Sequence, residues 1–115
     1  MDTHSGLWFH GWEFDGSGGG HNFAKSLWGR GNCWVTLAIP MFLDLLQLPK
    51  SDSTHRHLVS TFIRQVDGLL PLQDKETGLW HTLLDDPTSY VETSASAGFV
   101  GGMLMGIRLV CRIWI

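Results

Sequence analysis

One arginine of this chain lies between two tryptophans, and this is the grouping most suited to chemistry. Arg30 follows Trp28 and precedes Trp34 at the start of a long apolar segment. A guanidinium can hold a carboxylate through a bidentate charged hydrogen bond that contributes about 1.5–3 kcal/mol, and indole rings can stack on a ligand or wall a cleft. A group of this kind is suited to an acidic ligand. Two alternatives stay open: a surface or capping role for Arg30, and core packing for Trp34.

A seven-residue stretch occurs twice in the chain. The two copies are Asp2-Thr3-His4-Ser5-Gly6-Leu7-Trp8 and Asp74-Lys75-Glu76-Thr77-Gly78-Leu79-Trp80. A repeat of this kind indicates one supersecondary unit that is used more than once. Each copy opens a histidine-bearing, turn-rich loop that leads into an apolar helix. Two such loops on the same side of a helical scaffold predict a cleft of the kind that binds sugars.

Hydrophobic periodicity predicts three helices that carry these loops. One runs over about 29–46, where apolar residues recur every three or four positions, and Pro40 should kink it. A second follows the N-cap candidates at 51–53 and ends near position 71. A third begins near position 92 and continues to the C-terminus.

The fold class follows from these elements. Strand-type alternation is nearly absent, so the chain is predicted to be all-α. Helix pairs with long loops at one end are typical of an α/α toroid or of a part of one. A complete ring needs more pairs than this chain holds. We therefore expect apolar flanks to be exposed where neighbouring hairpins would pack.

Composition excludes some functions. The chain has 115 residues, 43% of them hydrophobic and 17% charged, which suits one domain with a core. A net charge of −3 and scattered basic residues give no footprint for nucleic acid. No signal peptide is visible after Met1, and the compartment, cytoplasmic or secreted, stays open.

Neither metal nor disulfide chemistry is expected. Cys33 and Cys111 lie far apart in predicted helices and are interpreted as buried free thiols. The sequence has no Cys/His zinc spacing, and His4, His21 and His81 are left without a role. We expect no metal and no cofactor.

The last predicted helix is unusually rich in glycine. Gly98, Gly102 and Gly106 form a GxxxGxxxG series, which can dimerise membrane helices or allow close packing on another helix. Arg108 and Arg112 would each cost about 2.5–3.5 kcal/mol at a bilayer centre. Packing within a folded domain is therefore the favoured interpretation.

Four segments together carry a family resemblance. In chain order they are Gly6-Leu7-Trp8-Phe9-His10-Gly11-Trp12-Glu13, Leu27-Trp28-Gly29-Arg30-Gly31-Asn32-Cys33-Trp34, Gln73-Asp74-Lys75-Glu76-Thr77-Gly78-Leu79-Trp80-His81 and Leu84-Asp85-Asp86-Pro87-Thr88-Ser89-Tyr90-Val91-Glu92-Thr93-Ser94-Ala95-Ser96-Ala97. The set resembles the unsaturated rhamnogalacturonyl hydrolases, glycoside hydrolases of families 88 and 105. The resemblance implies an (α/α)6 barrel without a cofactor.

The resemblance also implies a reaction. The family removes a Δ4,5-unsaturated galacturonyl residue from the non-reducing end of a pectin fragment. An acidic side chain protonates the vinyl ether double bond, water adds at the neighbouring carbon, and the hemiketal opens and releases the sugar. The implied ligand is an unsaturated galacturonyl-rhamnose oligosaccharide.

Site residues are carried over by position. The resemblance implies substrate-binding roles for His10, Trp28, Arg30 and Trp34. Trp12, Asn32 and Glu92 are weaker candidates, and Glu92 has a helix cap as its alternative.

The general acid is the main departure from the family pattern. No segment matches the family's proton-donating aspartate, and neither Asp15 nor Asp44 fills its place. We therefore expect residues 1–115 to be a single partial domain, a segment of the barrel without its catalytic residue. Such a segment should be inactive alone, because pre-positioned groups act as a unit. The rest of the barrel would be its partner.

Two other classes of function stay open. One is a carbohydrate-binding remnant that keeps the aromatic residues of a cleft without catalysis. The other is a helical interaction module, or a membrane-associated one, that uses the glycine-rich last helix.

Overall fold

The structure is a computed structural model that describes residues 1–12 and 23–111. Some residues or side chains named above lie outside this description: the residues Glu13, Asp15, His21 and Arg112, and the side chains of Trp12 and Cys111.

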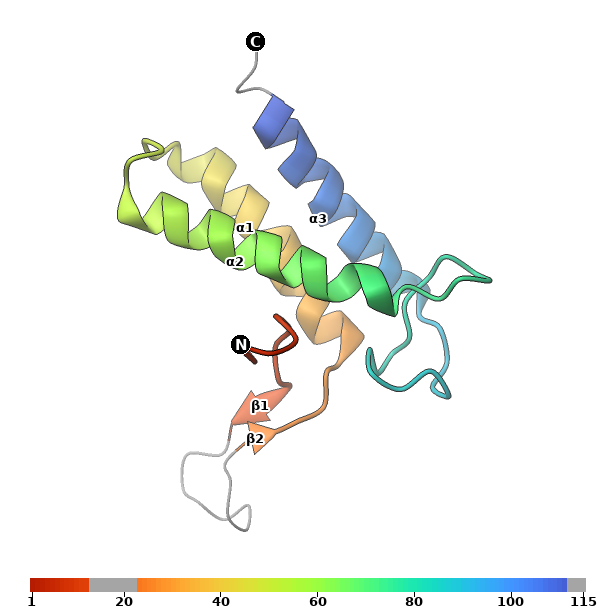
Figure 1. Cartoon of the computed structure of the whole chain (residues 1–115). Helices are drawn as coiled ribbons and strands as arrows, with labels where there is room; N and C mark the ends of the chain where they lie inside the picture. Colours follow the sequence, from red (N-terminus) through yellow and green to blue (C-terminus); the bar gives the residue numbers. More distant parts are fainter. Residues whose placement is uncertain (13–22, 112–115) are drawn as a thin grey trace.

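The described part of the chain forms three long α-helices and a small β-ribbon (Figure 1). The bounds are β1 (Gly11–Trp12), β2 (Phe23–Ala24), α1 (Gly29–Leu46), α2 (Ser53–Leu69), the 3-10 turn η1 (Leu70–Leu72) and α3 (Thr93–Cys111). β1 and β2 pair antiparallel with Gly11 opposite Ala24. The helical class is confirmed, and this ribbon of two short strands is an addition that the sequence did not predict.

Local chemistry sets the helix ends. The Oδ1 atom of Asp52 accepts the N–H groups of Thr54 at 2.7 Å and His55 at 3.3 Å, so one of the expected N-cap candidates starts α2. Gln47 ends α1 in the left-handed region, at φ 45°, and donates its N–H to the carbonyl of Leu43.

The repeated stretch contributes to the hydrophobic core. Trp80 and Phe99 meet edge to face, with ring centroids 5.3 Å apart. The indole N–H of Trp80 donates to the carbonyl of Leu69 at 2.8 Å, so its polar atom is satisfied inside the core. Leu7 and Leu69 are fully buried in the same cluster. The core thus joins both loops to the end of α2 and the start of α3.

Glycines allow α3 to pack closely on the other helices. A Cβ at Gly102 would lie 2.3 Å from the carbonyl oxygen of Thr36 in α1, and one at Gly106 would lie 2.5 Å from the Phe62 ring in α2. The glycine series is therefore explained by packing inside the domain. No helix in the described part of the chain is long and apolar enough to cross a membrane.

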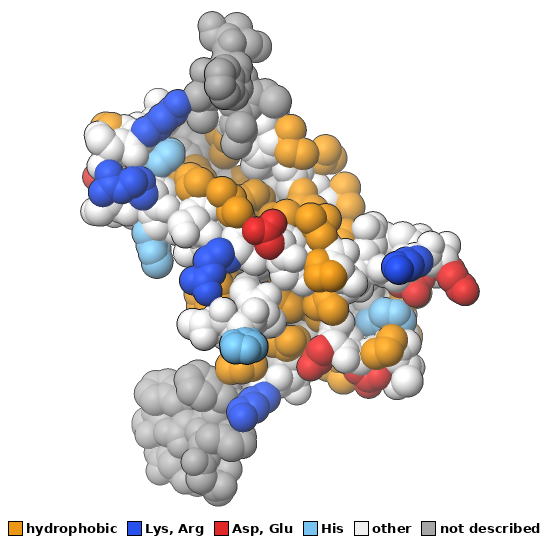
Figure 2. All heavy atoms as spheres, viewed as in Figure 1, with side chains coloured by type: hydrophobic (Ala, Val, Ile, Leu, Met, Phe, Trp, Pro, Cys, Tyr) orange, Lys and Arg blue, Asp and Glu red, His pale blue; other side chains and the backbone are white. Residues whose placement is uncertain are grey.

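Large hydrophobic side chains also remain on the surface, and Figure 2 shows them gathered in a band across the helices. Over the whole described surface, the exposed large hydrophobic residues come from all three helices and include Trp34, Met41, Phe42, Leu45, Ile63, Val100, Leu104 and Ile107. An apolar hollow of about 620 Å³ lies between α1, α2 and α3, and its lining includes Leu43, Val59, Phe62, Val66 and Ile107. The exposed apolar flanks expected from the sequence are present.

Candidate functional site

The repeated stretch folds into the same turn in both copies. Asp2 accepts the N–H and the hydroxyl of Ser5 at 3.0 and 2.6 Å, and Asp74 accepts those of Thr77 at 2.8 and 2.6 Å. The hydroxyl bond is the main reason that the pKa of each aspartate lies below its ordinary value. The next residue has φ +72° in both copies, which only glycine adopts without strain. The sequence repeat is therefore a structural repeat.

Each turn is tied to the following helix by one buried polar side chain. The Oδ1 atom of Asn32, the fourth residue of α1, accepts the N–H of Trp8 at 2.8 Å. The hydroxyl of Ser96, the fourth residue of α3, accepts the N–H of Trp80 at 2.9 Å. Both side chains also donate to the carbonyl of the residue just before their helix, at 3.0 and 2.7 Å. The two copies thus share an anchor as well as a turn.

The two loops lie side by side at the N-terminal ends of α1 and α3 (Figure 1). Leu84 donates its N–H to the carbonyl of Leu27 at 2.9 Å, and Gly29 donates to that of Thr82 at 2.8 Å. Trp28 forms an isolated bridge with Leu83. The expectation that both loops share one side of the scaffold is confirmed, and these bonds fix the start of α1 against the second loop.

At the N-terminal end of α1, the Trp28 ring contacts both the imidazole of His10 and the guanidinium of Arg30. The ring centroids of His10 and Trp28 are 4.9 Å apart, with the planes nearly perpendicular. The Cζ atom of Arg30 lies 4.9 Å from the centroid of the Trp28 ring, which is cation–π distance. His10 is held by its backbone N–H, which donates to the carbonyl of Ser26 at 3.0 Å.

Glu92 completes this group, and we call His10, Trp28, Arg30 and Glu92 the Arg30 cluster. The Oε1 atom of Glu92 lies 3.0 Å from the Nε atom of Arg30 and accepts the hydroxyl of Ser94 at 2.5 Å. The Oε2 atom is buried and has no hydrogen-bond partner in the described part of the chain. The Glu92 side chain is 10% exposed and that of Arg30 is 50% exposed. A ligand would therefore meet the guanidinium rather than the carboxylate.

The charges of Glu92 and Arg30 also act on the thiol of Cys33. Cys33 is buried and free, as expected, and its thiol donates to the carbonyl of Arg30 at 3.2 Å. Burial raises the pKa of the Cys33 thiol, the negative charge of Glu92 raises it further, and the positive charge of Arg30 opposes both. Cys33 is thus a packing residue rather than a nucleophile.

The Arg30 cluster contains four of the seven residues that the sequence placed in a site. Asn32 lies beneath it, 1% exposed, with its amide bonded to backbone atoms, so its observed role is to hold the first loop. Trp34 lies one turn beyond Arg30 on α1 and is 69% exposed. The side chain of Trp12 lies outside the described residues. The sequence did not assign Ser94 a role of its own. The one pattern that pointed to its contact with Glu92 was the Glu-x-Ser spacing.

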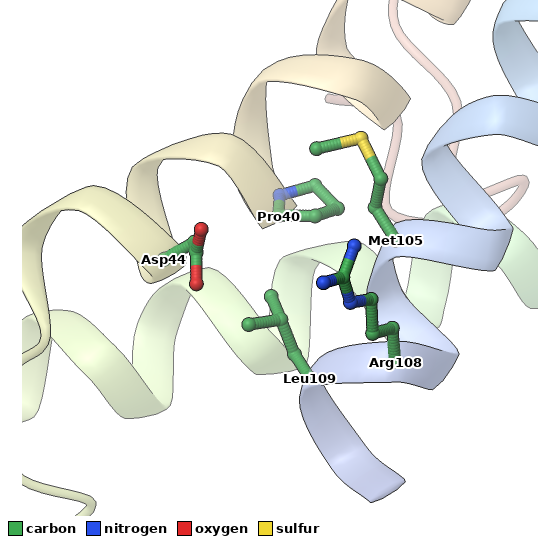
Figure 3. Close-up of a pocket in the computed structure, with 5 residues that line it drawn as sticks. All are labelled: Pro40, Asp44, Met105, Arg108 and Leu109. Atoms are coloured by element: carbon green, nitrogen blue, oxygen red, sulfur yellow. The ribbon is translucent and has the colours of Figure 1, made fainter. Parts of the chain in front are cut away.

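Asp44 lies far from the Arg30 cluster. It lines a hollow of about 90 Å³ with Pro40, Met105, Arg108 and Leu109. Figure 3 shows the Asp44 carboxylate and the Arg108 guanidinium on opposite sides of this hollow. At 1.5 Å per residue, Asp44 is about 20 Å beyond Arg30 along α1. It therefore supplies no acid at the cluster.

Comparison with known proteins identifies the family. The chain matches Glycosyl Hydrolase Family 88 over residues 1–111, a range that includes both loops and all three helices. The chain belongs to this family.

Two enzymes and one solved structure illustrate the similarity. The chain is 37% identical over 115 residues to the unsaturated rhamnogalacturonyl hydrolase YesR of Bacillus subtilis, covering 97% of this chain and 31% of that protein. It is 34% identical over 83 residues to the unsaturated 3S-rhamnoglycuronyl hydrolase of an Alteromonas species, covering 70% and 19%. A crystal structure from Salmonella enterica, described as a possible member of the GH105 family, has 54% identity and a TM-score of 0.86, covering 94% and 28%.

These matches extend over only part of the relatives. The chain spans less than a third of the length of each of the three proteins. It has the fold of a segment of the (α/α)6 barrel, as the sequence predicted.

Proposed function

We propose that residues 1–115 form one partial domain of an unsaturated uronyl hydrolase barrel and carry its uronate-binding wall. The ligand is a pectin-derived oligosaccharide that ends in a Δ4,5-unsaturated galacturonyl residue linked to rhamnose. The observation that supports this most is the half-exposed guanidinium of Arg30, which lies beside the Trp28 ring and is backed by Glu92. A carboxylate gains charged hydrogen bonds there, and a sugar gains an indole wall.

The names of the two enzyme relatives support the substrate class. One is named for an unsaturated rhamnogalacturonyl group and the other for an unsaturated 3S-rhamnoglycuronyl group. The shared element is the unsaturated uronide, and an arginine that binds its carboxylate serves both. The galacturonyl-rhamnose linkage is the finer part of the proposal.

The Arg30 cluster contributes binding and orientation to the reaction. Arg30 holds the carboxylate that is conjugated with the double bond, so the ring is fixed while that bond is protonated. His10 is exposed beside Trp28 and donates or accepts a hydrogen bond to the sugar or to water. Trp34, one turn from Arg30 and exposed, borders the same ligand.

The proton comes from elsewhere in the barrel. We propose that the family's general-acid aspartate lies outside residues 1–115, so this chain binds the uronide without turning it over. Further helical hairpins of the same barrel would cover the 620 Å³ apolar hollow. Those hairpins are the proposed partner.

Binding and turnover are tested together with the unsaturated galacturonyl-rhamnose disaccharide. Titration calorimetry measures binding, and the ultraviolet absorbance of the conjugated double bond reports turnover. We expect binding without loss of absorbance. Arg30→Ala should weaken binding by about 1.5–3 kcal/mol, or roughly ten- to hundredfold in Kd. Arg30→Lys should recover only part of it, because an ammonium lacks the planar fork.

Arg56→Ala is the matched control, since Arg56 is an exposed arginine on α2. Equal binding by the wild type and Arg30→Ala would refute the site. Turnover by the chain alone would show that the acid lies within it. Binding without turnover, even when the remaining barrel is supplied, would favour the carbohydrate-binding alternative.

A further inference from the structure

We propose that Glu92 is a positioning residue that holds Arg30 by its Nε atom and leaves the Nη1–Nη2 edge for the ligand carboxylate. This inference rests on the proposed function, because it assigns a working part to the same site. It also narrows the ligand to one with a planar, singly charged acid group.

The geometry of a guanidinium explains the first step. Arginine can grip a carboxylate through its Nε side or through the edge formed by its two terminal nitrogens. In this structure Glu92 occupies the Nε side at 3.0 Å. The Trp28 ring also lies against the guanidinium, with its centroid 4.9 Å from the Cζ atom. A ligand carboxylate is thereby directed to the terminal edge, in the plane of the guanidinium.

Glu92 is itself held firmly enough to fix another side chain. Its backbone N–H donates to the carbonyl of Trp80 at 2.8 Å, and its carbonyl accepts the N–H of Ser96 at 3.1 Å. Its Oε1 atom accepts the hydroxyl of Ser94 at 2.5 Å. The carboxylate therefore has a fixed position between the second loop and the first turn of α3.

A helix cap does not account for the Glu92 side chain. The bonds that start α3 use the backbone carbonyl of Glu92, whereas its carboxylate pairs with Arg30 and Ser94. Its Oε2 atom is buried without a partner in the described part of the chain, which is costly for a carboxylate. Costs of this kind are typical of functional sites.

The pairing also affects which anion binds. Glu92 offsets part of the charge of Arg30, so the affinity for an incoming anion depends on geometry as well as on net charge. A planar carboxylate matches the open edge of the guanidinium. A sulfate ion carries more charge and places it near the Glu92 carboxylate, so it should bind less well. The ion pair thus favours a uronate over an inorganic anion.

The first test observes the pair without any ligand. The Nε–H proton of Arg30 is followed by NMR, and its exchange with water reports the bond to Glu92. We expect slow exchange in the wild type and in Glu92→Gln, because a glutamine oxygen still accepts the bond. Exchange should be fast in Glu92→Ala. Glu76→Gln, an exposed glutamate in the second loop, is the control. Equally fast exchange in the wild type and Glu92→Ala would overturn the proposal.

The second test measures affinity for D-galacturonate by NMR titration, with galactose and sodium sulfate as comparison ligands. Glu92→Ala should weaken galacturonate binding about two- to tenfold, the usual effect of having to order one long side chain. The same change should have no effect in an Arg30→Ala background. Glu92→Gln should keep most of the galacturonate affinity and bind sulfate better than the wild type does.

The outcomes separate the two proposals. A loss of affinity that is equal in both backgrounds, or that follows a lower melting temperature, would show a merely structural role for Glu92. If the wild type does not prefer galacturonate to galactose, the uronate-binding function fails. The Nε–H exchange then still decides whether Glu92 positions Arg30.

Discussion

Two buried polar side chains, Asn32 and Ser96, anchor the two loops. Replacing Asn32 by alanine should destabilise the protein more than replacing Ser96 by alanine. Asn32 is 1% exposed and makes three side-chain hydrogen bonds. Its Oδ1 atom accepts the N–H of Trp8 at 2.8 Å, and its Nδ2 atom donates to the carbonyls of Trp8 and Trp28 at 3.0 Å each. Alanine removes all three bonds and leaves the Trp8 N–H without its partner.

The magnitude follows from the bond count. A neutral hydrogen bond contributes a net of about 0.5–1.5 kcal/mol, and a donor left unsatisfied adds to the loss. Asn32→Ala should therefore lower the free energy of unfolding by about 3 kcal/mol. Ser96→Ala removes two bonds from the second anchor and should cost about 1–2 kcal/mol. Ser60→Ala, at an exposed position of α2, should stay within about 0.5 kcal/mol.

Urea unfolding followed by tryptophan fluorescence and far-ultraviolet circular dichroism measures all three variants. We expect the largest loss of stability in Asn32→Ala, a smaller loss in Ser96→Ala and the smallest in Ser60→Ala. A cost below about 1 kcal/mol for Asn32→Ala would refute it, because the first loop would then not depend on this anchor. If Ser96→Ala lowered the free energy of unfolding by no more than Ser60→Ala does, the equivalence of the two repeats would also be contradicted.

Three further predictions concern packing, acid and thiol chemistry. Gly102→Ala should cost about 1–3 kcal/mol, since its Cβ would lie 2.3 Å from the Thr36 oxygen; Gly101→Ala, with its nearest atom at 3.5 Å, should be neutral or stabilising in thermal unfolding. The pKa of Asp74 is lowered from 3.8, chiefly by the Thr77 hydroxyl. The contribution of this carboxylate to folding stability is therefore full above pH 3.8 and is lost as the pH falls through the lower folded-state pKa. An NMR titration midpoint for Asp74 at or above 3.8 would contradict this. Cys33 should react slowly with iodoacetamide at neutral pH because burial and Glu92 raise its pKa, and Glu92→Gln should speed the reaction; an unchanged rate would argue against the contribution of Glu92.

The helices were predictable because their signals are local. The apolar period from Gly29 gave the bounds of α1, and Asp52 caps α2 through hydrogen bonds to residues two and three positions later. The repeat was visible for the same reason, since the Asp74–Thr77 turn closes within a few residues. Exposed apolar flanks followed from the number of helix pairs in the chain.

The site was predictable only in part. Trp28 and Arg30 are two residues apart, so their contact is a short-range feature that the sequence displays. The bond from Arg30 to Glu92 joins α1 to the residue just before α3 and depends on how α3 packs beside α1, which no local pattern encodes. For Asn32, the sequence pattern suggested substrate binding rather than a role in anchoring the first loop. It belongs to a site motif, yet its amide is committed to backbone groups.

The most direct measurement of uronate binding detects NMR contacts between the protons of the bound unsaturated disaccharide and the protein side chains. We expect the vinyl proton of the uronyl ring to contact the indole protons of Trp28, and Arg30→Ala to abolish these contacts. Contacts confined to Phe62 and Val59 in the apolar hollow, with none to Trp28, would contradict the placement of the sugar at the Arg30 cluster.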